Sequence, residues 1–123
     1  RGREILQFCG DNLVVYSGDD ASATELMILG ARGSISVTAN VAPAALAEIS
    51  RLVLAGENDA ARQLDKQLAP LNHALFLQSN PIPVKWALAD MGRIGRGIRL
   101  PLLELEAAYH EPFRAALREA GVL

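Results

Sequence analysis

Short apolar runs and helical patterns alternate in the first third of the chain. Glu4–Cys9 has helical character, Leu13–Tyr16 is continuously apolar, Ala21–Leu29 is helical, and Ile35–Thr38 is rich in strand formers. A continuously apolar run of four residues is typical of a parallel strand that is buried on both faces. The order helix, strand, helix, strand therefore predicts an α/β fold with a parallel sheet.

The pattern also predicts that this sheet needs further chain around it. Two strands alone make no stable sheet and leave both edges open. The helix over Ala21–Leu29 has almost no polar face, so it must be covered on two sides, by the sheet and by another subunit. In isolation, Leu13–Tyr16 and Leu26–Leu29 would expose apolar surface. Glu4–Cys9 follows Arg1-Gly2-Arg3 without an N-cap residue, as in a helix entered in its middle or a frayed terminus.

The pattern after Pro43 predicts helices only. One helix ends near Gly56, and a stripe of leucines from Leu64 to Leu75 marks a second, which Pro70 should kink or end. A third helix starts at Asn80–Pro83, Gly92–Gly97 forms a loop, and a last helix runs from about Leu103 to Ala120. The second half of the chain is therefore predicted to be a small helical bundle.

Composition and charge exclude several classes of function. The 123 residues carry 12 basic and 14 acidic side chains, a net charge of −2, and only 5% aromatic residues, which argues against a nucleic-acid partner. No apolar run approaches the roughly 18 residues of a membrane span. A single cysteine, Cys9, allows no internal disulfide and favours a reducing compartment. A cytoplasmic globular protein is the expectation.

Four segments resemble a known family in both order and spacing. They are Tyr16–Asp20 (YSGDD), Gly33–Val41 (GSISVTANV), Asn80–Lys85 (NPIPVK) and Arg99–Leu102 (RLPL). Together they resemble the dihydrodipicolinate synthase branch of the N-acetylneuraminate lyase family, whose members are pyruvate-dependent class I aldolases. The resemblance covers the whole chain, which looks like the carboxy-terminal two-fifths of the family's sequence.

The resemblance implies a fold. Family members have a (β/α)8 TIM barrel followed by a three-helix carboxy-terminal domain. Residues 1–55 would be the last two βα units of the barrel, with strands seven and eight, and residues 56–123 would be the helical domain.

The resemblance also implies a reaction. The family's synthases condense pyruvate with aspartate 4-semialdehyde to 4-hydroxy-tetrahydrodipicolinate, in lysine and diaminopimelate biosynthesis, and work as homo-oligomers, tetramers or dimers. Pyruvate forms a Schiff base with a lysine, so no separate cofactor is needed. The segment carrying that lysine, like the catalytic tyrosines and arginine, finds no match in this chain. No catalytic residue is therefore expected among the 123, and the segment alone should be inactive. Gly18, Asp19 and Ile35 match positions that line the substrate pocket.

Other side chains are weighed on their own chemistry. Asp19 and Asp20 more often cap the following helix than act as an acid–base pair, although the resemblance makes pocket lining equally good for Asp19. Lys85, near a helix start, is better interpreted as a structural ion pair or packing contact than as a substitute nucleophile. The arginine-rich loop Gly92–Arg99 follows a helix, so a solvated connection is favoured over a phosphate site.

No metal site is predicted. His73 falls off the leucine stripe and should be exposed, and His110 has no second ligand at metal spacing. Cys9 is expected to be a small buried or half-buried hydrophobe.

Two alternatives to the synthase remain open at this stage. The chain could be a non-catalytic helical module for interaction or oligomerisation, which would bind a partner through Ala21–Leu29. It could also be part of a related lyase that acts on a different 2-oxo acid.

Overall fold

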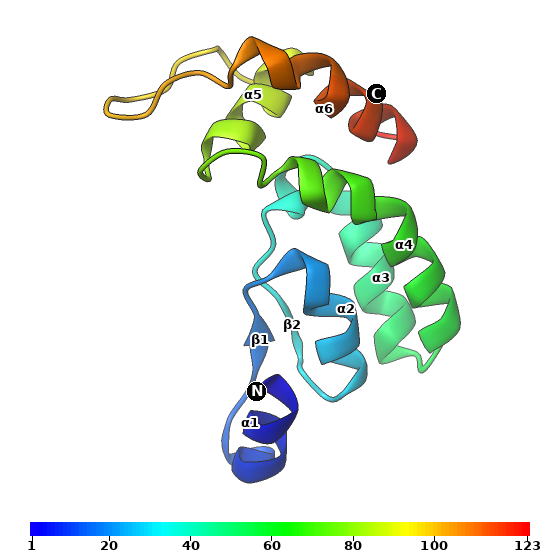
Figure 1. The fold of residues 1–123 in the computed structure, drawn as a ribbon. Helices are drawn as coiled ribbons and strands as arrows, with labels where there is room; N and C mark the ends of the chain where they lie inside the picture. Colours follow the sequence, from blue (N-terminus) through cyan, green and yellow to red (C-terminus); the bar gives the residue numbers. More distant parts are fainter.

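The computed structural model describes residues 1–123 except Asp11. Its helices are α1 (Gly2–Cys9), α2 (Asp20–Ile28), α3 (Pro43–Leu54), α4 (Asn58–Ala74), α5 (Ile82–Asp90) and α6 (His110–Glu119). The strands β1 (Tyr16–Ser17) and β2 (Gly33–Ser34) and the 3-10 helices Gly10–Asn12, Thr38–Asn40 and Ala107–Tyr109 complete the order. The strands and α1–α4 form one part of the molecule, and α5 and α6 lie beyond the end of α4 (Figure 1).

β1 and β2 form a parallel pair that α2 connects, as the sequence predicts. Tyr16 pairs with Gly33 and Ser17 with Ser34. The strands are shorter than predicted and are displaced from the ranges 13–16 and 35–38. A strand is defined by its ladder of hydrogen bonds, and no strand in the described chain pairs with the free edges of this two-stranded sheet.

Apolar side chains around the sheet face solvent. Leu13, Val14 and Tyr16 are 52%, 59% and 56% exposed. The prediction of burial on both faces is therefore wrong for this chain, and the prediction that this run exposes apolar surface is confirmed. In the run Leu26–Leu29, which was also expected to expose apolar surface, only Leu29 is exposed. Met27 is buried, because α3 and α4 pack against α2.

α4 is the central helix of the fold, in contact with α2, α3 and α6. Pro70 neither ends it nor splits it, so the helix continues to Ala74. An interior proline costs about 3 kcal/mol. The side chains of Leu68 and Leu71 on either side of Pro70 are almost completely buried, and each contributes a burial term of about 2–3 kcal/mol, which offsets this cost.

The last helix begins at His110, later than the predicted Leu103. Residues 103–106, which precede the 3-10 helix Ala107–Tyr109, are held in a non-helical form by their own contacts. The Leu105 side chain is buried, its carbonyl oxygen lies 2.9 Å from Nε2 of His110, and Gln78 exchanges two hydrogen bonds with Glu106. A helix through these residues would break those contacts.

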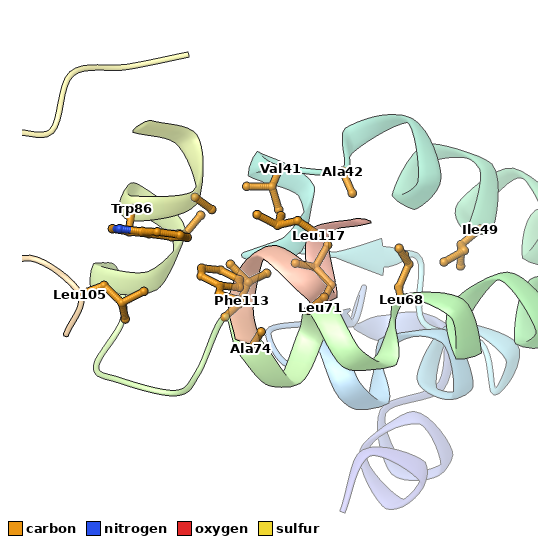
Figure 2. Packing of buried hydrophobic residues seen from close by; sticks show 14 of the residues in the cluster. Val41, Ala42, Ile49, Leu68, Leu71, Ala74, Trp86, Leu105, Phe113 and Leu117 are labelled. Atoms are coloured by element: carbon orange, nitrogen blue, oxygen red, sulfur yellow. The ribbon is translucent and has the colours of Figure 1, made fainter. Parts of the chain in front are cut away.

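The core runs without interruption from α2 to α6. Figure 2 shows Phe113 of α6 between Trp86 of α5 and the leucines of α4. The ring centroids of Trp86 and Phe113 are 5.5 Å apart, and those of Trp86 and His110 are 4.6 Å apart. The division into residues 1–55 and 56–123 remains a prediction.

Candidate functional site

The structure brings two of the three predicted pocket residues to one hollow. Gly18, which directly follows β1, and Ile35, which directly follows β2, both line it. The other lining residues come from the segment after β2, from α5 and from the two residues before α5, and they are Ser36, Val37, Asn40, Asn80, Pro81, Val84, Lys85 and Leu88. The hollow therefore lies where the carboxyl ends of parallel strands meet, the usual place for sites in parallel α/β folds.

Backbone hydrogen bonds set the positions of Gly18 and Ile35. The amide of Ile35 donates to the carbonyl oxygen of Ser17 at 2.7 Å, which extends the ladder past β2. The Ser17 hydroxyl donates to the Asp19 carbonyl oxygen at 3.0 Å and accepts from the Asp19 amide at 3.2 Å, so the turn at Gly18 is fixed. The side chain of Ile35 is 77% exposed. Contact of either residue with a substrate remains a prediction.

Asp19 directly follows Gly18 but does not line the same hollow. It lines a second hollow, together with Asp65, Asn72 and His73. Its exposed carboxylate accepts a hydrogen bond from the Ser22 hydroxyl at 2.5 Å. It holds the N-cap position of α2 but makes no capping hydrogen bond to the helix backbone, so the capping prediction is wrong for this residue.

Asp20 is the residue that sequence reasoning missed. Its side chain is buried, and Oδ2 accepts the backbone amides of Val37 at 2.9 Å and Thr38 at 3.2 Å. It therefore caps the turn after β2, on the rim of the first hollow, and not α2. The signal was the second acid of the GDD sequence, but the partner amides are 17 and 18 residues away and no local pattern points to them.

A second buried bond ties the same turn to α4. The hydroxyl of Thr38, fully buried, donates to Oδ1 of Asn72 at 2.6 Å. A buried acceptor that loses its donor costs about 1–3 kcal/mol. Two side chains therefore fix Thr38 in the turn after β2, at the rim of the first hollow. Asp20 attaches this turn to α2, and Asn72 attaches it to α4.

The second hollow is acidic. Burial raises the pKa of Asp65, and the nearby negative charges of Glu25 and Asp20 raise it further, whereas a hydrogen bond with the Thr24 side chain lowers it. His73 is exposed, as predicted. In the part of the chain that the structure describes, no three His, Cys, Asp or Glu side chains are placed to hold a metal ion.

The two lysines occupy different surroundings. Lys66 is exposed on α4, and Lys85 is half-buried at the first hollow. The predicted ion pair of Lys85 is not found, since no carboxylate of the described residues lies within 4.0 Å of its ammonium group. Gly92–Gly97 is exposed, as expected of a solvated connection, and Cys9 is half-buried.

No helix of the described residues has the length and apolar character needed to cross a membrane.

Comparisons with known proteins match the chain from end to end. The family model described as the dihydrodipicolinate synthetase family matches residues 1–120. Proteins named 4-hydroxy-tetrahydrodipicolinate synthase from Stutzerimonas stutzeri and Pseudomonas aeruginosa are each 54% identical over all 123 residues. The chain spans 42% of the length of both relatives.

Solved structures give the same picture. The chloride-inhibited dihydrodipicolinate synthase from Acinetobacter baumannii, complexed with pyruvate, matches with a TM-score of 0.97 and 50% identity, over 100% of this chain and 42% of that one. A protein described as the first monomeric dihydrodipicolinate synthase variant matches with a TM-score of 0.90 and 37% identity, over 98% of this chain and 40% of that one.

Proposed function

Since the chain belongs to the dihydrodipicolinate synthetase family, we propose that it serves as the carboxy-terminal part of a 4-hydroxy-tetrahydrodipicolinate synthase. Such a lyase condenses pyruvate with aspartate 4-semialdehyde in lysine and diaminopimelate biosynthesis. The observation that carries the proposal is the match of every residue to a relative solved with pyruvate, at a TM-score of 0.97.

In this proposal β1, α2, β2 and α3 are the last two βα units of a (β/α)8 barrel, and α4–α6 form the carboxy-terminal helical domain. The parallel pairing of β1 with β2 and the crossover through α2 support the assignment. The unpaired sheet edges and the exposed Leu13 and Val14 support it as well, because neighbouring barrel strands would cover them.

Gly18 and Ile35 would line the pyruvate pocket at the catalytic rim, and Asp19 would line the second hollow. The imine-forming lysine would come from outside these 123 residues, because Lys66 is exposed on a helix surface and Lys85 lies in the turn-and-helix wall of the hollow. No cofactor enters the scheme. A cytoplasmic homo-oligomer, a tetramer or a dimer, is the proposed working form, and the exposed Leu29 at the end of α2 is consistent with a subunit contact.

A chimera tests the proposal. The P. aeruginosa relative would keep its own sequence except for the matching 42%, which this chain replaces, and formation of 4-hydroxy-tetrahydrodipicolinate would be followed. At 54% identity we expect a folded enzyme that turns over both substrates. A chimera that folds and assembles like the relative but shows no turnover would overturn the proposal.

The 123-residue chain alone gives a second readout. Treated with pyruvate and borohydride, it should show no reduced pyruvate adduct by intact-protein mass spectrometry, because the proposed imine-forming lysine lies outside these 123 residues. An adduct on Lys85 would contradict the division of labour proposed above.

A further inference from the structure

Hydrogen bonds, more than apolar packing, hold the wall of the first hollow that follows β2. Residues Ile35–Val37 come directly after β2 and line this hollow, and we call them the rim segment. The Ile35 side chain is 77% exposed, and those of Ser36 and Val37 are half-buried. No side chain of the rim segment is therefore enclosed in the core, and the position of the segment depends on its hydrogen bonds.

The rim segment is held at both of its ends. At its start, the amide of Ile35 donates to the carbonyl oxygen of Ser17 at 2.7 Å. At its end, Oδ2 of Asp20 accepts the amide of Val37 at 2.9 Å and the amide of Thr38 at 3.2 Å. Hydrogen bonds to a carboxylate are stronger than those to a neutral acceptor. The Asp20 side chain therefore fixes the end of the rim segment relative to β1 and α2.

Asp20 acts from behind the wall of the hollow. Its side chain is only 5% exposed, and it is not among the residues that line the hollow. It can affect a ligand there only through the residues that it holds in place. Productive geometry in an active site is held to within about 0.5 Å, and a misplacement of about 1 Å can lower the rate roughly a hundredfold.

We propose that Asp20 is a positioning residue of the lyase reaction. Its carboxylate sets the place of the rim segment, and thereby the fit of pyruvate in the hollow, without touching the substrate. The inference rests on the proposed function, which supplies the reaction and the substrate.

The place of one acceptor oxygen, and not the negative charge, is the property that this role requires. Oδ2 makes both bonds to the rim segment, whereas Oδ1 is buried without a hydrogen-bond partner. An asparagine side chain has the same shape and carries one acceptor oxygen, which can take the place of Oδ2.

Three substitutions in the chimera described above separate the position of the oxygen from its charge. Asp20→Asn keeps an acceptor oxygen in place and removes the charge, Asp20→Glu keeps the charge and moves the carboxylate by one methylene group, and Asp20→Ala removes the acceptor. We expect Asp20→Asn to retain most of the activity and a KM for pyruvate close to that of the unsubstituted chimera. Asp20→Glu and Asp20→Ala should raise this KM and lower kcat/KM roughly ten- to a hundredfold. If Asp20→Ala does not fold, the comparison of Asp20→Asn with Asp20→Glu decides the question.

Arg114→Met is the control for a general loss of stability. It breaks the ion pair with Asp90, and Arg114 lines neither of the two hollows. A variant that is only less stable contains less folded enzyme, so its maximal rate falls while its KM stays the same. Arg114→Met should therefore keep the KM of the unsubstituted chimera. An unchanged KM in a folded Asp20→Glu chimera would overturn the inference, as would equal rises in Asp20→Asn and Asp20→Glu or in Arg114→Met and Asp20→Glu.

The unsubstituted chimera separates this inference from the proposed function. If it folds and assembles without turnover, the proposed function fails and the inference fails with it. If it turns over both substrates and every folded Asp20 variant keeps its KM, only the inference fails.

Discussion

Replacing Asp20 with alanine tests whether one buried carboxylate holds the rim of the candidate site. Oδ2 of Asp20 accepts the amides of Val37 and Thr38, at 2.9 and 3.2 Å, and Thr38 is fully buried. The substitution would leave the Thr38 amide without a partner inside the protein and the half-buried Val37 amide partly open to water.

The magnitude follows from these contacts. A hydrogen bond to a charged group contributes about 1.5–3 kcal/mol, and the Thr38 amide should lose most of that contribution. Release of the buried carboxylate offsets part of the loss, because Oδ1 of Asp20 is buried without a hydrogen-bond partner. We therefore expect Asp20→Ala to lower the free energy of unfolding by about 2 kcal/mol, roughly a thirtyfold change in the folding equilibrium.

The neighbouring acid provides the matched control. Asp19 is exposed and binds only the Ser22 hydroxyl, so Asp19→Ala should cost about 0.5 kcal/mol or less. Urea unfolding followed by circular dichroism would measure both variants, and hydrogen exchange would report on the Val37 and Thr38 amides. Only Asp20→Ala should lose their protection. An equal cost for the two variants, or protected amides in Asp20→Ala, would refute the reasoning.

Substitutions at three further side chains, with Arg51→Met as a control for the first, test other parts of the structure. Arg114→Met should lower the free energy of unfolding more than Arg51→Met in the same urea titration, because the Arg114 guanidinium binds both Asp90 oxygens, at 2.9 and 2.6 Å, whereas Arg51 belongs to an exposed ion pair. Arg114 lowers the pKa of Asp90, so the stabilisation by this ion pair is complete above the ordinary carboxyl pKa near 3.8 and is lost as the pH falls through the lower pKa of the folded state. The difference in unfolding free energy between wild type and Arg114→Met should therefore disappear at that lower pH. Asp65→Asn should raise stability at pH 7, since burial raises the pKa of Asp65 and disfavours its charge; a lower melting temperature would contradict this. Phe113→Ala should cost about 3–5 kcal/mol, measured by urea unfolding, and an effect below about 1 kcal/mol would mean that the ring is not the packing centre described.

The helices were the most predictable part of the fold. Leu68 and Leu71 mark the buried face of α4 at helical spacing, and this periodicity is a local property that a sequence displays. The effect of Pro70 was overestimated because tertiary burial on both sides of it decided the outcome. The start of α6 was misplaced for a similar reason, since Leu105 is held by contacts with other elements.

The site was predictable only in part. Gly18 and Ile35 meet at one hollow because they follow neighbouring parallel strands, which the order of the elements already indicates. The prediction that Asp19 and Asp20 cap α2 was wrong because adjacent acids look alike in a sequence. The fold leaves Asp19 exposed and buries Asp20, whose carboxylate binds the distant amides of Val37 and Thr38. Lys85 was interpreted as a structural ion pair or a packing contact, and the described residues form no ion pair with it, which is visible only when the surrounding side chains are in place.

The open edges of the β1–β2 pair can each accept a further strand, either from another copy of the chain or, in the proposed enzyme, from a neighbouring part of the same barrel. Pairing with another copy is bimolecular, so its rate grows with the square of the chain concentration. Pairing with a strand on the same polypeptide is unimolecular and is indifferent to dilution. The amount of chain present at once, and not only its sequence, therefore decides whether Leu13 and Val14 become covered within one fold or between molecules.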